Sequence, residues 1–260
     1  MQSLTDSIRN SGVLEIRDRM ASISGGRVLD VGTQHGSFIA VMMKSMKDYE
    51  AFVGIDISKE DLQKARDAIK EDSVEFKLMN AEELSFDDNS FDTVCLSFSL
   101  HHLSNVGIVL REMLRVLKPG GYLILQEMYS DGDQSAAQLA EIHTHHLGAK
   151  LDRIEGTPHY ETFTRKQLKD TVNELGVGDV EVYETTWSLK CLYCDNLHQC
   201  DDPRSDYNIK FGREEVQGVL DRAKNHPDTE DIQQEARLLL DNMERTGYQS
   251  ASLLFFICKK

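Results

Sequence analysis

Basic residues are scarce in this sequence, and so are long apolar runs. Its 260 residues include 29 lysines and arginines against 44 aspartates and glutamates, a formal net charge of −15. Such a charge repels phosphate backbones and anionic lipids. The sequence shows no secretory signal, which would be a positively charged N-terminus followed by an apolar segment. The most apolar run, 251–258, is far shorter than the roughly 20 residues that span a bilayer. We therefore expect a cytoplasmic protein that binds neither nucleic acid nor membrane.

Cysteine is too sparse for a disulfide framework. Five cysteines, an odd number in a chain without a secretory signal, indicate reduced thiols. One group has metal-ligand character, namely Cys191, Cys194, His198 and Cys200. A C-x-x-C pair can hold zinc, but a structural zinc site normally joins two such pairs, and the sequence has no second one. Packed thiols are the favoured interpretation, and a metal site is the alternative.

The sequence does contain a strand, turn and helix junction of the kind that binds a small molecule. The apolar run 27–32 enters a turn that holds Gly32 and Gly36. Glycine lets a ligand approach the backbone closely, and the free N–H groups at the start of the following helix favour a negative group. A second apolar run, 51–55, leads to Asp56. That spacing is typical of the carboxylate that a doubly wound sheet presents to a ribose.

The glycine pattern of this turn argues against a dinucleotide. Dinucleotide folds need G-x-G-x-x-G, in which the second glycine makes room for the pyrophosphate and the third lets the helix pack on the strand. Gln34 and Ser37 occupy those positions here. The Cβ atom of Gln34 predicts either an ordinary φ at this position or a different backbone approach. Dinucleotide oxidoreduction is therefore the least favoured function.

Apolar periodicity alternates between strand and helix along most of the chain. The expected strands span 27–32, 51–57, 74–79, 92–98, 121–127, 180–187 and 252–258, and the expected helices span 37–47, 59–71, 105–117, 136–154 and 164–175. Parallel strands need crossover connections. The alternation therefore predicts an α/β, Rossmann-like doubly wound sheet that is mostly parallel, with helices on both faces and a ligand at the carboxyl ends of its strands.

Four further segments between residues 25 and 128 follow the order and spacing of one known family. They are Asp56, Asn80-Ala81, the run 89–102 that ends in Leu100-His101-His102, and the run 115–125 that contains Lys118-Pro119-Gly120-Gly121. On these segments the chain resembles the class I S-adenosylmethionine-dependent methyltransferases, in their small-molecule, quinone-biosynthesis-like branch. The resemblance implies S-adenosylmethionine as cofactor and S-adenosylhomocysteine as product. It also implies that the last two strands are adjacent and that one of them is antiparallel.

By this resemblance, ten residues hold or border the cofactor. Asp30 and the glycine loop shape the methionine pocket, Asp56 takes the ribose hydroxyls, and Ser97 lies near the methionine amine. Asn80 and Ala81 border the adenine, and the amide oxygen of Asn80 can accept a hydrogen bond from the adenine amine although the family usually has aspartate there. The full set is Asp30, Gly32, Thr33, Gln34, Gly36, Asp56, Ile57, Asn80, Ala81 and Ser97.

The expected helix 136–154 carries two candidate residues for the methyl acceptor. Helical spacing puts His143 and His146 on one stripe with Leu139, Leu147 and Ile154 and turns His145 away. If this helix closes over the cleft, both histidines would bind the acceptor, orient it or take its proton. Packing as core histidines is an equally favoured interpretation, and a metal held by the pair is a minor alternative.

Two further positions are candidates near the acceptor. His101 and His102 follow the fourth strand at its carboxyl end, where His102 could act as a general base, although a structural role is favoured. His159 and Tyr160 form either a lid contact with the acceptor or a surface turn.

The length favours one elaborated methyltransferase domain over residues 1–260. A helical cap over 1–24 is expected to cover the cofactor cleft, and insertions 129–163 and 188–248 are expected to form helical lids that select the acceptor. The predicted reaction is in-line methyl transfer to a small organic acceptor. A non-catalytic cofactor-binding protein and a protein methyltransferase that docks through 188–248 are the alternatives. The sequence leaves the acceptor atom and the oligomeric state open.

Overall fold

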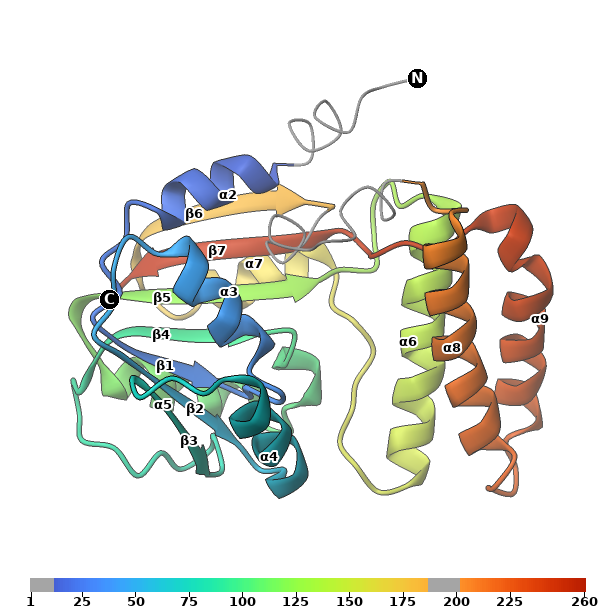
Figure 1. Cartoon of the computed structure of the whole chain (residues 1–260), viewed down its shortest axis with the longest axis horizontal. Helices are drawn as coiled ribbons and strands as arrows, with labels where there is room; N and C mark the ends of the chain where they lie inside the picture. Colours follow the sequence, from blue (N-terminus) through green and yellow to red (C-terminus); the bar gives the residue numbers. More distant parts are fainter. Residues whose placement is uncertain (1–11, 187–201) are drawn as a thin grey trace.

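The computed structural model describes residues 12–186 and 202–260, and a seven-stranded sheet forms its centre (Figure 1). The strand order is β3-β2-β1-β4-β5-β7-β6. The first five strands pair in parallel, and β7 pairs antiparallel with both β5 and β6. The predicted doubly wound sheet with one antiparallel strand is therefore confirmed. The strands are β1 (Arg27–Val31), β2 (Ala51–Asp56), β3 (Val74–Leu78), β4 (Phe91–Ser97), β5 (Leu117–Met128), β6 (Gly178–Thr185) and β7 (Leu253–Lys259).

Helices cover both faces of the sheet, because its central strands are apolar on both sides. One core packs α5 (Val106–Val116) and α7 (Arg165–Asn173) against the sheet, and Leu29 and Val31 of β1 belong to it. The other core contains Val28 of β1 and lies between the opposite face of the sheet and the three helices that cover that face. These are α2 (Val13–Met20), α3 (Ser37–Ser45) and α4 (Lys59–Ala68). Between residues 27 and 117, the predicted elements end within three residues of the observed ones.

The described part of the expected N-terminal cap is α2. Its residues Val13, Ile16 and Met20 are buried against the sheet, and α2 packs beside β6 (Figure 1). The guanidinium of Arg19 donates to the carboxylate of Glu181 on β6, with a shortest distance of 2.7 Å. This helix therefore covers the antiparallel end of the sheet.

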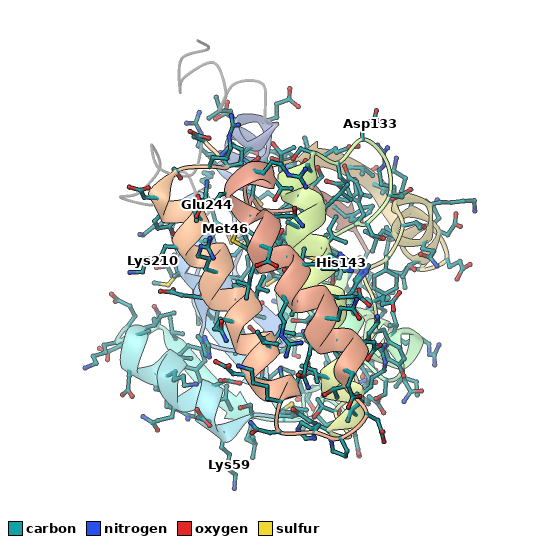
Figure 2. All side chains as sticks on the ribbon, turned by 90° about the vertical axis from the view of Figure 1, so that its right-hand side faces the viewer. Met46, Lys59, Asp133, His143, Lys210 and Glu244 are labelled. Atoms are coloured by element: carbon teal, nitrogen blue, oxygen red, sulfur yellow. The ribbon has the colours of Figure 1, made fainter. Side chains whose placement is uncertain are left out.

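A three-helix bundle stands beside the carboxyl edge of the parallel strands (Figures 1 and 2). It contains α6 (Ala136–Ile154) from the first expected insertion, and α8 (Asp206–Ala223) and α9 (Glu230–Thr246) from the second. The shared core includes Leu147 of α6, Leu220 of α8 and Ala236 of α9. None of the helices within 12–186 and 202–260 has the length and apolarity needed to cross a bilayer.

Candidate active site

A cleft of about 470 Å³ lies at the carboxyl edge of β1, β2 and β4. The loop after β1, the end of β2, the loop after β3 and the 3₁₀ helix η1 (Leu100–His102) contribute to its lining. The sequence-predicted residues that line it are Gly32, Gln34, Asp56, Ile57, Asn80, Ala81 and His102. The topology thus collects residues from four separate segments, because parallel strands end at one edge of the sheet.

Two backbone groups orient the carboxylate of Asp56 at the end of β2. Its Oδ2 accepts a hydrogen bond of 2.9 Å from the N–H of Gln34, and its Oδ1 accepts one of 2.9 Å from the N–H of Ser58. A carboxylate has about four lone-pair sites in all, so each oxygen retains the capacity to accept a further hydrogen bond. Asp56 is therefore held in place and can still bind a pair of hydroxyl groups.

The loop after β1 keeps a left-handed backbone at Gln34, where φ is +45°. Of the two alternatives expected for Gln34, an ordinary φ is therefore excluded. Hydrogen bonds of 2.9 Å from Thr33 N–H to the Ile55 carbonyl and from Gln34 N–H to Asp56 anchor the loop to β2. Since these bonds dictate the path of the chain, Gln34 adopts a conformation that costs an L-residue roughly 1–2 kcal/mol.

Gly32 has a physical reason to be glycine. Its φ is +69°, and a Cβ atom built there would lie 2.8 Å from Oγ of Ser99. Ser99 lines the cleft, whereas Ser97 was the serine expected there. The hydroxyl of Ser97 instead accepts a hydrogen bond of 2.7 Å from the side chain of Gln126, and Ser97 is not among the lining residues. The contact of Ser99 with Gly32 depends on the register of β1 and β4, which a single sequence does not show.

Three other residues of the predicted cofactor set lie behind the cleft surface. Asp30 is buried in β1, Thr33 is buried within the loop, and Gly36 precedes the first turn of α3. Burial raises the pKa of the Asp30 carboxyl to about 7. The thiol of Cys95 lies 3.5 Å from its Oδ1. These residues support the loop from below rather than line the cleft.

The structure corrects the orientation expected for α6. His143 is 48% exposed and its Nε2 lies 2.7 Å from a carboxylate oxygen of Glu235 on α9, while Nε2 of His146 lies 2.9 Å from the hydroxyl of Thr162. Figure 2 views this side of the bundle, with His143 labelled. Neither histidine lines the cleft. Part of the helix face that was expected to point at the cleft points to solvent, since Leu139 and Ile154 on that face are each 49% exposed.

The reason is that α8 and α9 cover one apolar side of α6. Ala140, Leu147 and Leu151 pack into the bundle core. A different side of α6 therefore faces the sheet, and His145 lies on that side. This residue, which was expected to point away from the site, lies among three further histidines.

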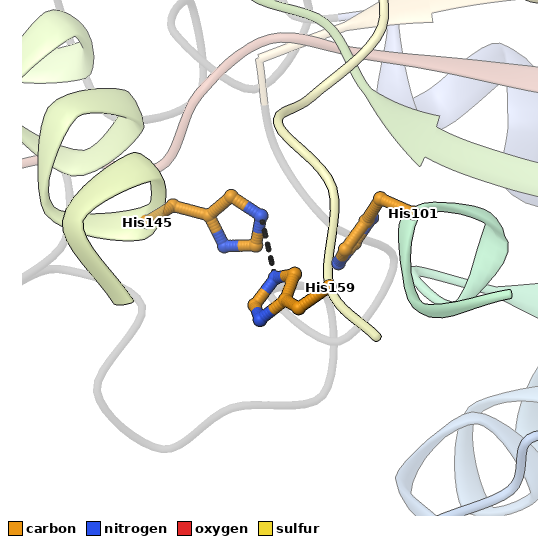
Figure 3. Close-up of side chains that lie close together, drawn as sticks. All are labelled: His101, His145 and His159. Carbon is orange, nitrogen blue, oxygen red and sulfur yellow. Dashed lines mark hydrogen bonds between the residues drawn. The ribbon is translucent and has the colours of Figure 1, made fainter. Parts of the chain in front are cut away.

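Four histidines form a cluster between the sheet and the bundle. The ring centroids of His101 and His145 are 4.6 Å apart, and those of His102 and His159 are 4.0 Å apart. Nε2 of His145 lies 3.2 Å from Nε2 of His159 (Figure 3). Burial, with the neighbouring histidines, lowers the pKa of His102 to about 3 and that of His145 to about 2. Both rings are therefore neutral at pH 7.

The cluster separates two cavities. His102 lines the cleft at the sheet edge, whereas His145 and His159 line a second cavity of about 380 Å³ between α6 and α8. Thr144 and Tyr248 also line the second cavity. The rings of the cluster thus form a wall with one cavity on each side.

The remaining candidates have other surroundings. The side chain of Tyr160 is half exposed and does not line the cleft, but its backbone N–H donates a 2.7 Å hydrogen bond to the carbonyl of His101. Thr157 and Pro158, just before it, do line the cleft. The possible zinc ligands Cys191, Cys194, His198 and Cys200 lie outside the described residues.

The strand order, the glycine loop and the acid at the end of β2 define a Rossmann-like protein, a class whose ligands bind at the carboxyl ends of the strands. A family model described as "Methyltransferase domain" matches residues 29–125. The ubiquinone/menaquinone biosynthesis C-methyltransferase UbiE of Vibrio cholerae is 31% identical over 188 residues, which cover 65% of this chain and 70% of that protein. The chain belongs to the class I S-adenosylmethionine-dependent methyltransferases, and it is an enzyme of the quinone-biosynthesis-like branch.

Two more comparisons show how far the similarity extends. The UbiE enzyme of Vibrio parahaemolyticus is 31% identical over 134 residues, and the match spans 50% of this chain and 52% of the relative. A solved structure of phosphoethanolamine N-methyltransferase 2 from Haemonchus contortus, in complex with S-adenosyl-L-methionine, has a TM-score of 0.55 at 20% identity. It covers 95% of this chain and 52% of that one. At this identity the likeness shows a shared fold.

Proposed function

We propose that this chain binds S-adenosylmethionine in the cleft at the sheet edge and transfers its methyl group to a small organic acceptor. When bound, the cofactor supplies an electrophilic methyl group. The observation that carries the proposal is an open cleft against the glycine loop and Asp56. Its volume of about 470 Å³ lies within the roughly 300–1,000 Å³ of small-molecule sites.

We assign the ends of the cofactor to the lining residues as follows. Asp56 accepts hydrogen bonds from the ribose hydroxyls, and Asn80 and Ala81 border the adenine. The amide oxygen of Asn80 accepts a 3.0 Å hydrogen bond from the N–H of Glu82, and its second lone pair is free for the adenine amine. Gly32 and Gln34 bring the backbone close to the amino-acid end. Asp30, Thr33, Gly36 and Ser97 keep these lining residues in place.

The acceptor is enclosed in part by the insertion 129–163. Thr157 and Pro158 of this insertion line the cleft, which supports its role as a lid. The described part of 188–248 packs against α6 in the bundle, so we do not propose it as a docking surface for a protein substrate. The names of the Vibrio relatives refer to C-methylation in quinone biosynthesis. A small aromatic acceptor of the quinone-precursor type is therefore the first class to assay.

Calorimetric titration with S-adenosylhomocysteine tests the cofactor site. We expect one bound ligand per chain, and Asp56→Ala should weaken its binding at least tenfold because the ribose loses hydrogen bonds to a charged group, worth about 1.5–3 kcal/mol. Asp67→Ala, an exposed acid on α4, is the matched control and should bind as the wild type does. An absence of heat at millimolar ligand would refute the assignment.

Turnover is measured separately. The protein is incubated with S-adenosylmethionine labelled in its methyl group and with small phenolic or quinol acceptors, and labelled product is quantified. Cofactor binding without transfer to any acceptor would favour the non-catalytic alternative.

A further inference from the structure

We propose that His101, His145 and His159 bind a divalent transition-metal ion, with zinc the best match. The three side chains approach one point from three parts of the fold: η1, α6 and the segment before α7 (Figure 3). One ring nitrogen of each lies within 4.8 Å of the other two. Imidazole nitrogen is a preferred ligand of zinc and related ions. This site is separate from the cofactor cleft, and the proposal holds whether or not the methyl-transfer assignment does.

The spacing of two ring nitrogens matches a tetrahedral ion. A zinc–nitrogen bond measures about 2.0–2.1 Å, so two nitrogens bound to one tetrahedral zinc lie about 3.3 Å apart. Nε2 of His145 and Nε2 of His159 are 3.2 Å apart. These two atoms need almost no movement to share an ion.

The third ring, that of His101, closes the site with a small shift. Its ligand nitrogen lies at most 4.8 Å from those of His145 and His159, and this distance must shorten by up to about 1.5 Å to reach the nitrogen–nitrogen separation at a tetrahedral zinc. His101 is buried, and its Nδ1 lies 3.0 Å from a carboxylate oxygen of Glu127 but makes no hydrogen bond. A rotation of the ring toward the other two histidines would therefore change this contact with Glu127.

Asp152 prepares His159 to act as a ligand. Nδ1 of His159 lies 2.5 Å from Oδ2 of Asp152, whose other oxygen accepts a hydrogen bond from Arg222. A proton on Nδ1 leaves the lone pair of Nε2 free and directed at the cluster. Metal-bound histidines almost always donate their second ring N–H to a carboxylate, a backbone carbonyl or water, which fixes both tautomer and ring orientation.

Three protein ligands leave the fourth position of a tetrahedral ion open, which is the arrangement of catalytic zinc sites. His145 and His159 line the second cavity, where the hydroxyl-bearing residues Thr144 and Tyr248 are also found. The open position is therefore available to water or to a small molecule with an oxygen, nitrogen or sulfur donor. On the other side of the cluster, His102 lines the cofactor cleft, one ring away from His159.

Zinc titration of chelator-treated full-length protein, followed by calorimetry, tests the site. The wild type should bind one equivalent of zinc, and this binding should require the histidines of the cluster. His145→Ala and His159→Ala should each weaken this binding by more than about 100-fold, and Asp152→Asn should weaken it about 10–100-fold. His143→Ala is the matched control, because it removes a histidine from the same helix outside the cluster, and its affinity should equal that of the wild type.

Cobalt distinguishes this site from one built on thiols. Co²⁺ bound by nitrogen ligands gives visible bands without a strong near-ultraviolet charge-transfer band, whereas thiolate ligation adds such a band. Wild type should give the first spectrum, and His145→Ala should lose it. Absence of zinc binding, unchanged binding in both alanine variants, or a thiolate spectrum would each overturn the proposal.

Controls separate loss of the site from loss of the fold. Each variant is checked by thermal melting and by titration with S-adenosylhomocysteine, which reports the separate cleft. If an alanine variant does not fold, His145→Asn and His159→Asn replace it, and retained wild-type zinc affinity in both would overturn the proposal. If wild type binds zinc but not S-adenosylhomocysteine, the cofactor assignment fails and the metal site stands.

Discussion

Replacing Gln34 by glycine should stabilise the protein. Gln34 has a φ of +45°, its side chain is exposed, and a left-handed conformation costs an L-residue roughly 1–2 kcal/mol. Glycine removes this cost but adds entropy to the unfolded chain, which offsets roughly 0.5–1 kcal/mol. The expected net gain for Gln34→Gly is therefore about 0.5–1 kcal/mol, or roughly 1–4 °C in Tm for a chain of this size.

Urea denaturation and thermal melting measure this gain. Gln34→Ala is the matched control, because alanine removes the side chain but keeps the Cβ atom that makes a positive φ costly. It should be no more stable than the wild type. The titration with S-adenosylhomocysteine should give a similar or tighter affinity for Gln34→Gly, since the loop path is unchanged. If Gln34→Gly unfolds at the same urea concentration as Gln34→Ala, or at a lower one, the loop carries no such strain.

Four other substitutions test the packing around the site. Leu147→Ala, in the bundle core, should lower the free energy of unfolding by about 2–5 kcal/mol. Leu139→Ala, half exposed on the same helix, should change it by less than about 0.5 kcal/mol. Equal effects of the two substitutions on urea denaturation would contradict the orientation of α6. Gly32→Ala should weaken S-adenosylhomocysteine binding, because its Cβ would meet Ser99 at a positive φ, and wild-type affinity would refute this. Burial raises the pKa of Asp30 to about 7, so its contribution to stability is fully present below about pH 4 and is lost as the pH rises through 7. Asp30→Asn should therefore gain stability relative to wild type between pH 4 and 8, by at most about 4 kcal/mol, and parallel stability curves in urea would count against a raised pKa.

Local patterns along the chain predicted the sheet and the edge at which the cleft lies. Strand and helix periods are properties of consecutive residues, so the elements from β1 to β5 could be located within a few residues. Parallel strands end at one edge of the sheet, which predicts a ligand site at that edge, and the family resemblance assigns Gly32, Asp56 and Asn80 to it. The structure places all three on one cleft.

The left-handed backbone at Gln34 could not be predicted in the same way. The residue type argues against a positive φ, and the bonds that impose it come from Ile55 and Asp56, about twenty residues away. Ser99 was missed for a similar reason. Its contact with Gly32 follows from the pairing of two strands that are distant in the sequence.

What the sequence determined by itself is the class of fold, the edge of the sheet that holds the cleft and the extent of α6, because each depends on neighbours along the chain or on a rule that all parallel sheets obey. Only the tertiary structure decided which side of α6 faces the sheet. A helical period shows that apolar sides exist, but the packing of α8 and α9 on Leu147 determines which side remains for the site. The same packing brings His145 to His101 and His159, three residues whose separation along the chain gives no sign that they meet.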